Sequence, residues 1–154
     1  ARDYENVMFV VGSAAEIPWE ENYFDKVLSV ESFYYYPDQE IVLDELFRVM
    51  APRARLFILI NLYTDNPYSL QWVPKLKVPV HVLSADEYVE LLTEHGFENV
   101  EYRKIPDDTP TPDGYKTTSF HSLDDLKAFK KIGALLLMAS KPDVRSRAPG
   151  HSIS

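Results

Sequence analysis

Few residues of this chain have the types and spacing that direct chemistry requires. Cysteine is absent, which excludes a thiol nucleophile, a thiolate metal ligand and a disulfide. The four histidines, His81, His95, His121 and His151, never fall at the short spacing of a zinc motif, so we expect no structural metal. No Ser/His/Asp set or carboxylate pair stands out either. The groups available for catalysis are therefore single carboxylates, hydroxyls and imidazoles in loops.

Two residues are candidate general bases. Glu31 directly follows the apolar segment Phe24–Val30, and His81 precedes a helix that we expect to be capped by Ser84. Either side chain can take a proton from a hydroxyl or an amine. Aromatic side chains near them would form an apolar pocket able to face a cation: Tyr34, Tyr35, Tyr63, Tyr68 and Trp72.

Alternating strand and helix patterns must position these residues. Short apolar or alternating runs predict strands at Val7–Val11, Phe24–Val30, Leu56–Ile60, Val100–Ile105 and Ala134–Ala139. Amphipathic segments predict helices from Asp38 to a stop at Pro52, from Ser84 to Gly96 with a capping box, and from Ser122 to Gly133. This order predicts an α/β fold whose parallel strands close on an antiparallel terminal pair. Ligands of such sheets bind beyond the carboxyl ends of the strands, so the loops after Val11, Val30 and Ile60 are where a site is expected.

Composition limits the classes of partner. The chain has 154 residues, 45% of them hydrophobic and 26% charged, which predicts one soluble domain at 1–141 and a tail at 142–154 with little to bury. A net charge of -8 opposes the phosphate backbone, so we expect no nucleic-acid partner. The longest apolar run is Leu56–Ile60, too short for a membrane span, and no signal-peptide core follows Ala1. We therefore expect no membrane contact and a cytoplasmic protein.

Three stretches in order resemble a class I methyltransferase family. They are Gly12–Trp19 (GSAAEIPW), Phe24–Val27 (FDKV) and Leu46–Ile60 (LFRVMAPRARLFILI). Their succession is similar to that of the S-adenosylmethionine (SAM) dependent methyltransferases related to ubiquinone/menaquinone and sterol methyltransferases. The later helix start at Ser84 and the turn Glu94–Phe97 match the same pattern, so the resemblance covers about residues 5 to 141. It implies a partial Rossmann-like methyltransferase sheet, SAM as cofactor and methyl transfer as the activity.

The resemblance also implies roles for individual positions. The loop that faces the adenine ring maps to Ser13, Ala14 and Ala15, and the turn beside the methionine part of the cofactor maps to Ser29, Val30 and Glu31. Tyr34 and Tyr35 occupy positions that look toward the acceptor, with Tyr63 and Trp72 as further candidates for contacting it. For several of these residues, packing is as good an interpretation as binding.

Two features depart from the family pattern. Its Pro-Gly-Gly turn is replaced here by the segment 52–55 (PRAR), and its glycine-rich loop after the first strand is missing. The five glycines, at positions 12, 96, 114, 133 and 150, are never close enough to form such a loop. The family sheet runs 3-2-1-4-5-7-6, and its first two strands and first helix also have no counterpart in this sequence. We therefore expect a truncated methyltransferase domain.

The sequence is compatible with three functions. The first is methylation of a small, largely apolar acceptor by the full-length parent. Because methyl transfer mainly needs alignment of the reacting atoms, the lack of a fixed catalytic triad does not weigh against it. The second is a non-catalytic fragment or degenerate domain that acts as an association module, paired with a second copy through exposed strand edges. The third is an α/β module that binds another nucleotide.

Overall fold

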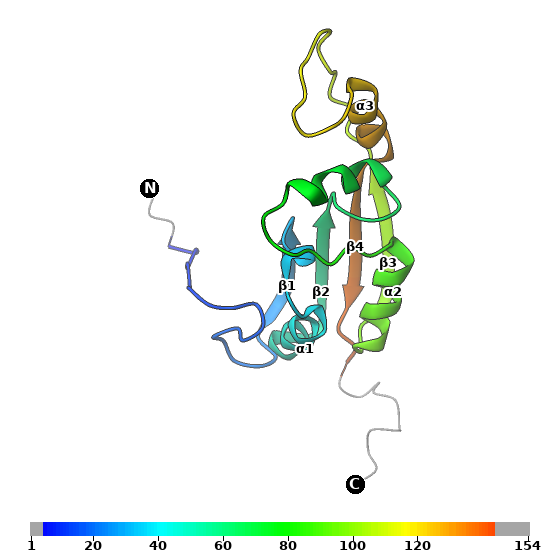
Figure 1. The fold of residues 1–154 in the computed structure, drawn as a ribbon. Coiled ribbons are helices and arrows are strands. Elements are labelled where there is room, and N and C mark those ends of the chain that lie inside the picture. Colours follow the sequence, from blue (N-terminus) through cyan, green and yellow to red (C-terminus); the bar gives the residue numbers. More distant parts are fainter. Residues whose placement is uncertain (1–4, 144–154) are drawn as a thin grey trace.

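The computed structural model describes residues 5–143, and its centre is a mixed sheet of four strands in the order β1-β2-β4-β3 (Figure 1). The strands are β1 (Phe24–Val30), β2 (Met50–Ile60), β3 (Glu98–Ile105) and β4 (Ala134–Ser140). β1 and β2 pair in parallel, whereas β4 pairs antiparallel with both β2 and β3. The predicted α/β fold with an antiparallel terminal pair is confirmed.

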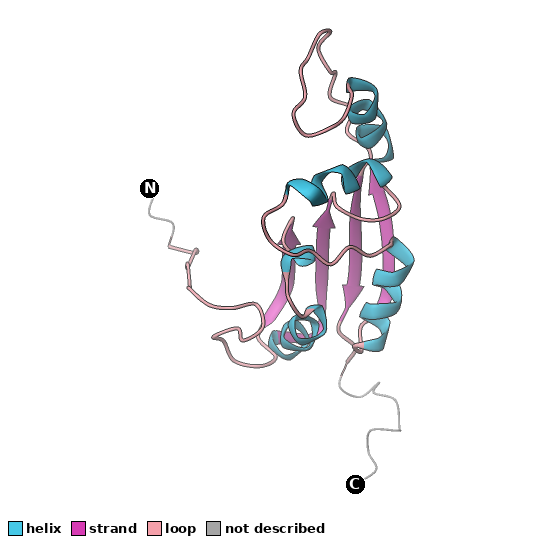
Figure 2. Cartoon of the chain, in the orientation of Figure 1, coloured by secondary structure: helices cyan, strands magenta, loops and turns pink. Residues whose placement is uncertain are grey.

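The helices begin where the sequence predicts. They are α1 (Gln39–Val49), α2 (Ala85–Glu94) and α3 (Leu123–Ile132), joined by the 3-10 segments η1 (Phe33–Tyr35) and η2 (Pro67–Lys75) (Figure 2). The side chains of Asp38, Ser84 and Ser122 cap the three α-helices by accepting backbone N–H groups of the first turn. Ser84 and Glu87 form the predicted capping box.

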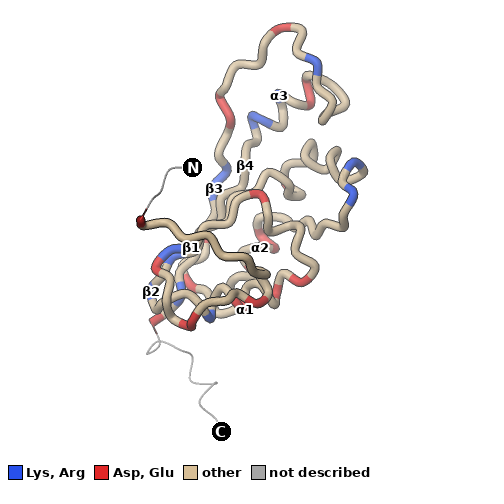
Figure 3. The backbone as a smooth tube through the Cα atoms, turned by 90° about the vertical axis from the view of Figure 1, so that its left-hand side faces the viewer, with Lys and Arg blue, Asp and Glu red and all other residues tan. Residues whose placement is uncertain are grey.

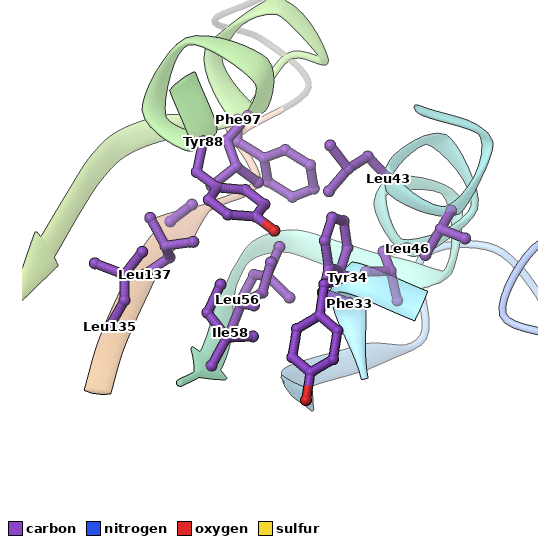
Figure 4. Packing of buried hydrophobic residues seen from close by; sticks show 14 of the residues in the cluster. Phe33, Tyr34, Leu43, Leu46, Leu56, Ile58, Tyr88, Phe97, Leu135 and Leu137 are labelled. Atoms are coloured by element: carbon purple, nitrogen blue, oxygen red, sulfur yellow. The ribbon is translucent and has the colours of Figure 1, made fainter. Parts of the chain in front are cut away.

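One face of the sheet packs against α1 and α2. Alternate residues of β2, Leu56, Ile58 and Ile60, are almost completely buried, as are Leu135 and Leu137 of β4. They form one cluster with apolar residues of both helices and with Phe33 and Tyr34 of η1 (Figure 4). This core fixes the ends of β1 and β2, and with them the loops that follow.

The strand predicted at Val7–Val11 is wrong. These residues form no strand and are exposed, with Phe9 at 94% and Val11 at 100%. A strand needs a neighbour to satisfy its backbone groups, and among residues 5–143 β1 pairs on one side only, with β2. The exposed side chains of Leu28 (67%) and Val30 (49%) lie on this same border strand.

The turn that replaces the glycine pair has an unexpected geometry. α1 ends at Val49, and β2 begins at Met50, so the segment 52–55 belongs to the strand rather than to a separate turn. Arg53 takes a left-handed conformation with φ 68°, the kind of backbone that glycine adopts without strain. A non-glycine residue therefore occupies a left-handed conformation in this segment.

The tail predicted at 142–154 lies outside the described residues from position 144 onward. Within residues 5–143 no helix has the length and apolar character needed to cross a bilayer. Lys and Arg occur in short, separated stretches along this part of the chain (Figure 3).

Candidate functional site

The candidate site lies where the parallel strands β1 and β2 end side by side. Glu31 is the first residue after β1, and Asn61 is the first residue after β2. The backbone N–H of Glu31 donates to the carbonyl of Leu59 (2.8 Å), which ties the turn to the neighbouring strand. The carboxyl ends of adjacent parallel strands are the usual ligand edge of an α/β sheet.

Two side chains hold the Glu31 carboxylate. The amide Nδ2 of Asn61 donates to one carboxylate oxygen at 2.9 Å, and the hydroxyl of Tyr34 donates to the other at 2.8 Å. Glu31 itself has φ 53°, a left-handed conformation that costs about 1 kcal/mol or more in a residue other than glycine. Strained residues of this kind concentrate at functional sites, and here the strain fixes where the carboxylate points.

Tyr34 is a permanent hydrogen-bond donor to this carboxylate. Its side chain is buried, and burial together with the hydrogen bond to Glu31 raises the pKa of the phenol far above its usual value. The ring belongs to the edge of the core cluster, with the hydroxyl turned away from the cluster (Figure 4). The core of the domain therefore positions the group that orients Glu31.

His81 is brought to the same region through its backbone. Its N–H donates to the carbonyl of Tyr34 (2.9 Å), and Gln39 Nε2 bridges the carbonyls of Phe33 (3.2 Å) and His81 (3.4 Å). The residue is exposed, so its imidazole is open to solvent at the rim. Both predicted bases are thus hydrogen-bonded to Tyr34, His81 through its backbone N–H and Glu31 through its carboxylate.

The residues predicted to contact the acceptor lie in two places: Tyr35 lies beside Tyr34 after β1, whereas Tyr63 and Trp72 lie in the segment after β2. Tyr35 packs against Tyr34 with ring centroids 4.6 Å apart and is 38% exposed. Tyr63 is completely buried, and its hydroxyl donates to the carbonyl of Gly133 (2.8 Å). Trp72 on η2 packs against two phenylalanine rings, Phe120 and Phe129, under α3.

The predicted cofactor residues also fall into two places. Ser13 and Ala14 line an open hollow of about 590 Å³ together with Trp19 and Phe24, at the start of β1 rather than at its end. The structure therefore does not bring Ser13, Ala14 and Ala15 to the turn formed by Ser29, Val30 and Glu31. In that turn, the hydroxyl of Ser29 is buried and has no hydrogen-bond partner within residues 5–143.

A salt-bridged pair on α1 holds the loop that carries Ser13. Arg48 donates from its guanidinium to the carbonyls of Ile17 and Trp19, both at 3.0 Å. Glu45 accepts from Arg48 and from the backbone N–H of Ile17. The hydrogen bonds to Arg48 are the main reason that the pKa of Glu45 is lowered, so the pair is ionised at neutral pH.

Asn61 is the site residue that the sequence interpretation missed. It is a polar residue directly after the most apolar strand of the chain, the same relation that Glu31 has to β1. That pattern was available in the sequence. Its significance depends on the pairing of β1 with β2, which only the fold shows.

The strand order and the polar strand ends together define the class of protein. A parallel pair followed by an antiparallel closing pair, in the order β1-β2-β4-β3, corresponds to strands 4-5-7-6 of the Rossmann-like methyltransferase sheet. Residues 1–58 match the family model described as "Methyltransferase domain".

Known proteins point the same way. The chain is 27% identical to the 27-O-demethylrifamycin SV methyltransferase of Amycolatopsis mediterranei, covering 90% of this chain and 60% of that enzyme. It is 29% identical to the chloroplastic tocopherol O-methyltransferase of Arabidopsis thaliana over 60% of this chain and 30% of that enzyme. Among solved structures, a methyltransferase in complex with the Trm112 activator of Haloferax volcanii is similar with a TM-score of 0.81 and 26% identity, covering 92% of this chain and 64% of that one. The chain is similar to class I SAM-dependent methyltransferases, and it spans less than two thirds of each of these relatives.

Proposed function

We propose that the protein carrying this chain transfers a methyl group from SAM to a small, largely apolar acceptor. The observation that carries the proposal is the Glu31 carboxylate, held by Asn61 and Tyr34 at the ligand edge of a methyltransferase sheet. The relatives named for rifamycin and tocopherol substrates act on small molecules, which supports the same acceptor class here.

The residues of this chain have separate tasks in such a reaction. When bound, SAM would supply an activated methyl group on a sulfonium. We assign Glu31 to the cofactor side, where the resemblance puts the methionine part of SAM, and both of its oxygens are oriented by protein donors. His81 lies on the acceptor side, where its exposed imidazole takes the proton released by a hydroxyl or amine.

Aromatic side chains support an apolar acceptor. Tyr35 is partly exposed beside Tyr34, and Trp72 lies with Phe120 and Phe129 beneath α3. Aromatic rings bury apolar surface and tolerate a nearby cation such as a sulfonium. We assign Tyr34, Tyr35 and Trp72 to the acceptor side, with Tyr63 as a buried support for the loop between β2 and α2.

The residues present fit one half of the cofactor. A fixed carboxylate at the end of β1 suits the cationic methionine end of SAM. The loop with Ser13, Ala14 and Ala15, which the resemblance assigns to the adenine, lies at the start of β1 and is not brought to that carboxylate. The described residues contain no glycine-rich loop that would receive the carboxylate of the cofactor. We therefore assign this chain to the β1 and β2 side of the cofactor pocket.

Calorimetry and a methylation assay test the proposal. The purified full-length protein that carries this chain should bind SAM or S-adenosylhomocysteine and should transfer labelled methyl groups to small phenols or amines. Ala14→Trp should weaken cofactor binding by filling the adenine side, while Ala128→Trp at a partly exposed position of α3 serves as the bulk-matched control. Methyl transfer confined to nucleic acid or protein would exclude the proposed acceptor class, and an unchanged dissociation constant in Ala14→Trp would remove the loop from the site.

A second candidate function, an association module, is favoured by the exposed apolar residues at the border of the sheet. Leu28 and Val30 of β1 and the segment 7–11 expose apolar surface that a second copy can cover. Sedimentation equilibrium tests this candidate: a dimer that dissociates in Leu28→Lys supports it. A strict monomer that binds SAM at micromolar concentration would exclude it.

A further inference from the structure

We propose that residues 106–133 form a hinged cap over the acceptor side of the site, and that Gln71 and Asp125 are the latch that holds the cap closed. The cap consists of the loop after β3, helix α3 and Gly133. The proposal rests on the proposed function, which assigns Trp72 to the acceptor side, and it adds how that ring becomes accessible.

The cap leaves the sheet and returns to it at the ligand edge. β4 runs antiparallel to both β2 and β3, so β3 ends at the same edge of the sheet as β2. Ile105, the last residue of β3, lies opposite Ala134, the first residue of β4. Figure 1 shows α3 and the loop before it projecting from this end of the sheet, next to η2. Both stems of the cap therefore meet at one place, as a hinge requires.

Hydrogen bonds within the cap hold it together as one body. The N–H of Asp107 donates to the carbonyl of Lys130 (2.9 Å), and the Asp107 carboxylate lies 3.7 Å from Lys130 Nζ. The same Nζ donates to the carbonyl of Thr109 and to the hydroxyl of Thr111 (3.3 Å). The loop after β3 is thus fastened to α3, and the two should move together.

The two ends of α3 are held differently. At its C-terminal end, Asn66 Nδ2 donates to the carbonyls of Phe129 (3.1 Å) and Gly133 (3.4 Å), and Asn66 is completely buried. Elsewhere the helix is amphipathic, but none of its residues is fully buried. Segments with little buried apolar surface open at a lower free energy than the core does. The C-terminal end is therefore the fixed stem, and the rest of the cap depends on polar contacts to stay closed.

Gln71 of η2 uses both ends of its amide to hold the free end of the cap. Its Nε2 donates to Asp125 Oδ2 (2.9 Å), and its Oε1 accepts the N–H of His121 (2.9 Å). Lys75 Nζ adds a bond to the carbonyl of Thr118 (2.6 Å). These contacts join η2 to the cap and involve no strand, so breaking them should free the cap and leave the sheet intact.

Closure of the cap covers Trp72. The indole ring packs against Phe120 and Phe129 of the cap, with ring centroids 5.7 and 5.0 Å apart. Its Nε1 is buried and has no hydrogen-bond partner within residues 5–143, which disfavours the closed arrangement. Opening would expose the ring for an apolar acceptor to pack on, and would give the N–H to an oxygen of that acceptor or to water.

Hydroxyl-radical footprinting and hydrogen exchange test the cap, both read by mass spectrometry on the full-length protein that carries this chain. Asp125→Ala removes the carboxylate that accepts from Gln71. We expect exchange in 107–115 and 121–130 to rise together about tenfold, as the loss of one hydrogen bond to a charged group implies. Oxidation of Trp72 should rise about threefold, because the ring is exposed for a larger fraction of the time. Exchange in α2 should not change.

Asp124→Ala is the matched control, because it removes a carboxylate from the same first turn of α3 without removing the latch. Gln71→Ala breaks the latch from the η2 side and should reproduce the effect of Asp125→Ala. Equal effects of Asp124→Ala and Asp125→Ala, or no effect of either latch variant, would overturn the latch. A rise confined to 121–125 would mean a frayed helix end and would overturn the hinged cap.

The role of the cap in acceptor binding has its own measurement. With phenol as the methyl acceptor, Asp125→Ala should lower the KM for phenol about threefold and leave SAM affinity unchanged, because more molecules are open to the acceptor. An unchanged KM would overturn this role and leave the proposed function standing. Footprinting needs no ligand, so a cap that opens as expected in a protein without methyl transfer would overturn the proposed function and not the cap.

Discussion

Replacement of Lys141 by methionine should destabilise the domain more than any surface substitution. Lys141 follows β4 directly and is only 5% exposed. Its Nζ donates to the carbonyls of Phe47 (2.7 Å) and Met50 (2.9 Å) and to Asn22 Oδ1 (2.9 Å). The ammonium also lies 4.6 Å from the centre of the Phe47 ring. It thus joins the end of α1, the start of β2 and the loop before β1.

The magnitude follows from the groups that Lys141→Met leaves without a donor. A hydrogen bond to a charged group contributes about 1.5 to 3 kcal/mol, and a buried acceptor left unpaired costs about 1 to 3 kcal/mol. Against these losses, methionine keeps the apolar stem and removes the cost of burying a cation, which is several kcal/mol. We expect a net loss of about 3 kcal/mol in the free energy of unfolding, or a drop of about 10 °C in Tm.

Urea and thermal unfolding followed by circular dichroism measure this loss. Lys104→Met is the matched control, because Lys104 is exposed on β3 and should change stability by less than about 0.5 kcal/mol. The anchor should also show in hydrogen exchange, with faster exchange of the Asn22 and Tyr23 amides, which bond to the end of α1. Equal stability of Lys141→Met and the control would refute the reasoning that the ammonium holds these elements together.

Three further predictions concern stability. The His95 ring bonds to Asp44 (2.7 Å) and Glu40 (3.3 Å); burial opposes its charging, but these carboxylates prevail and raise the pKa. A raised pKa in the folded state stabilises the protein at acid pH. The native chain should therefore exceed His95→Gln in free energy of unfolding most below about pH 6, and this difference should fade as pH rises through the folded-state pKa. A difference that grows with pH would contradict this. In Gly133→Ala, the new Cβ would lie 2.3 Å from the last carbonyl oxygen of β3, and the backbone of residue 133 has φ 90°. Urea unfolding should therefore show a loss of at least about 2 kcal/mol in the free energy of unfolding. A neutral result would show that the backbone can move aside. Arg53→Gly should relieve the strain of φ 68° and raise stability by up to about 1 kcal/mol in thermal melts, whereas a clear loss would mean that the arginine contacts outweigh the strain.

Local sequence patterns predicted the elements of this fold well, because each pattern reports a short-range cause. Ser84 and Glu87 can cap each other when a helix starts directly after Ser84, and the predicted capping box is present. The apolar run Leu56–Ile60 predicted a strand, and it forms the C-terminal part of β2. Glu31 was likewise identifiable, as a carboxylate that directly follows a strand.

Tertiary structure decided what depends on neighbours. The apolar pattern of Val7–Val11 is that of a strand, but a strand forms only where another strand offers its backbone groups, and here β1 pairs with β2 alone among residues 5–143. The role of Asn61 depends on the register that sets Val30 opposite Leu59, which places the two strand ends together. Lysine is usually a surface residue, and it is the convergence of α1, β2 and β4 that buries the Lys141 ammonium among carbonyl groups. The sequence by itself determined where helices start and where strands can form, because caps and apolar runs are local. The tertiary fold determined whether a strand finds a partner and which polar groups meet, because contacts between distant residues are set by packing.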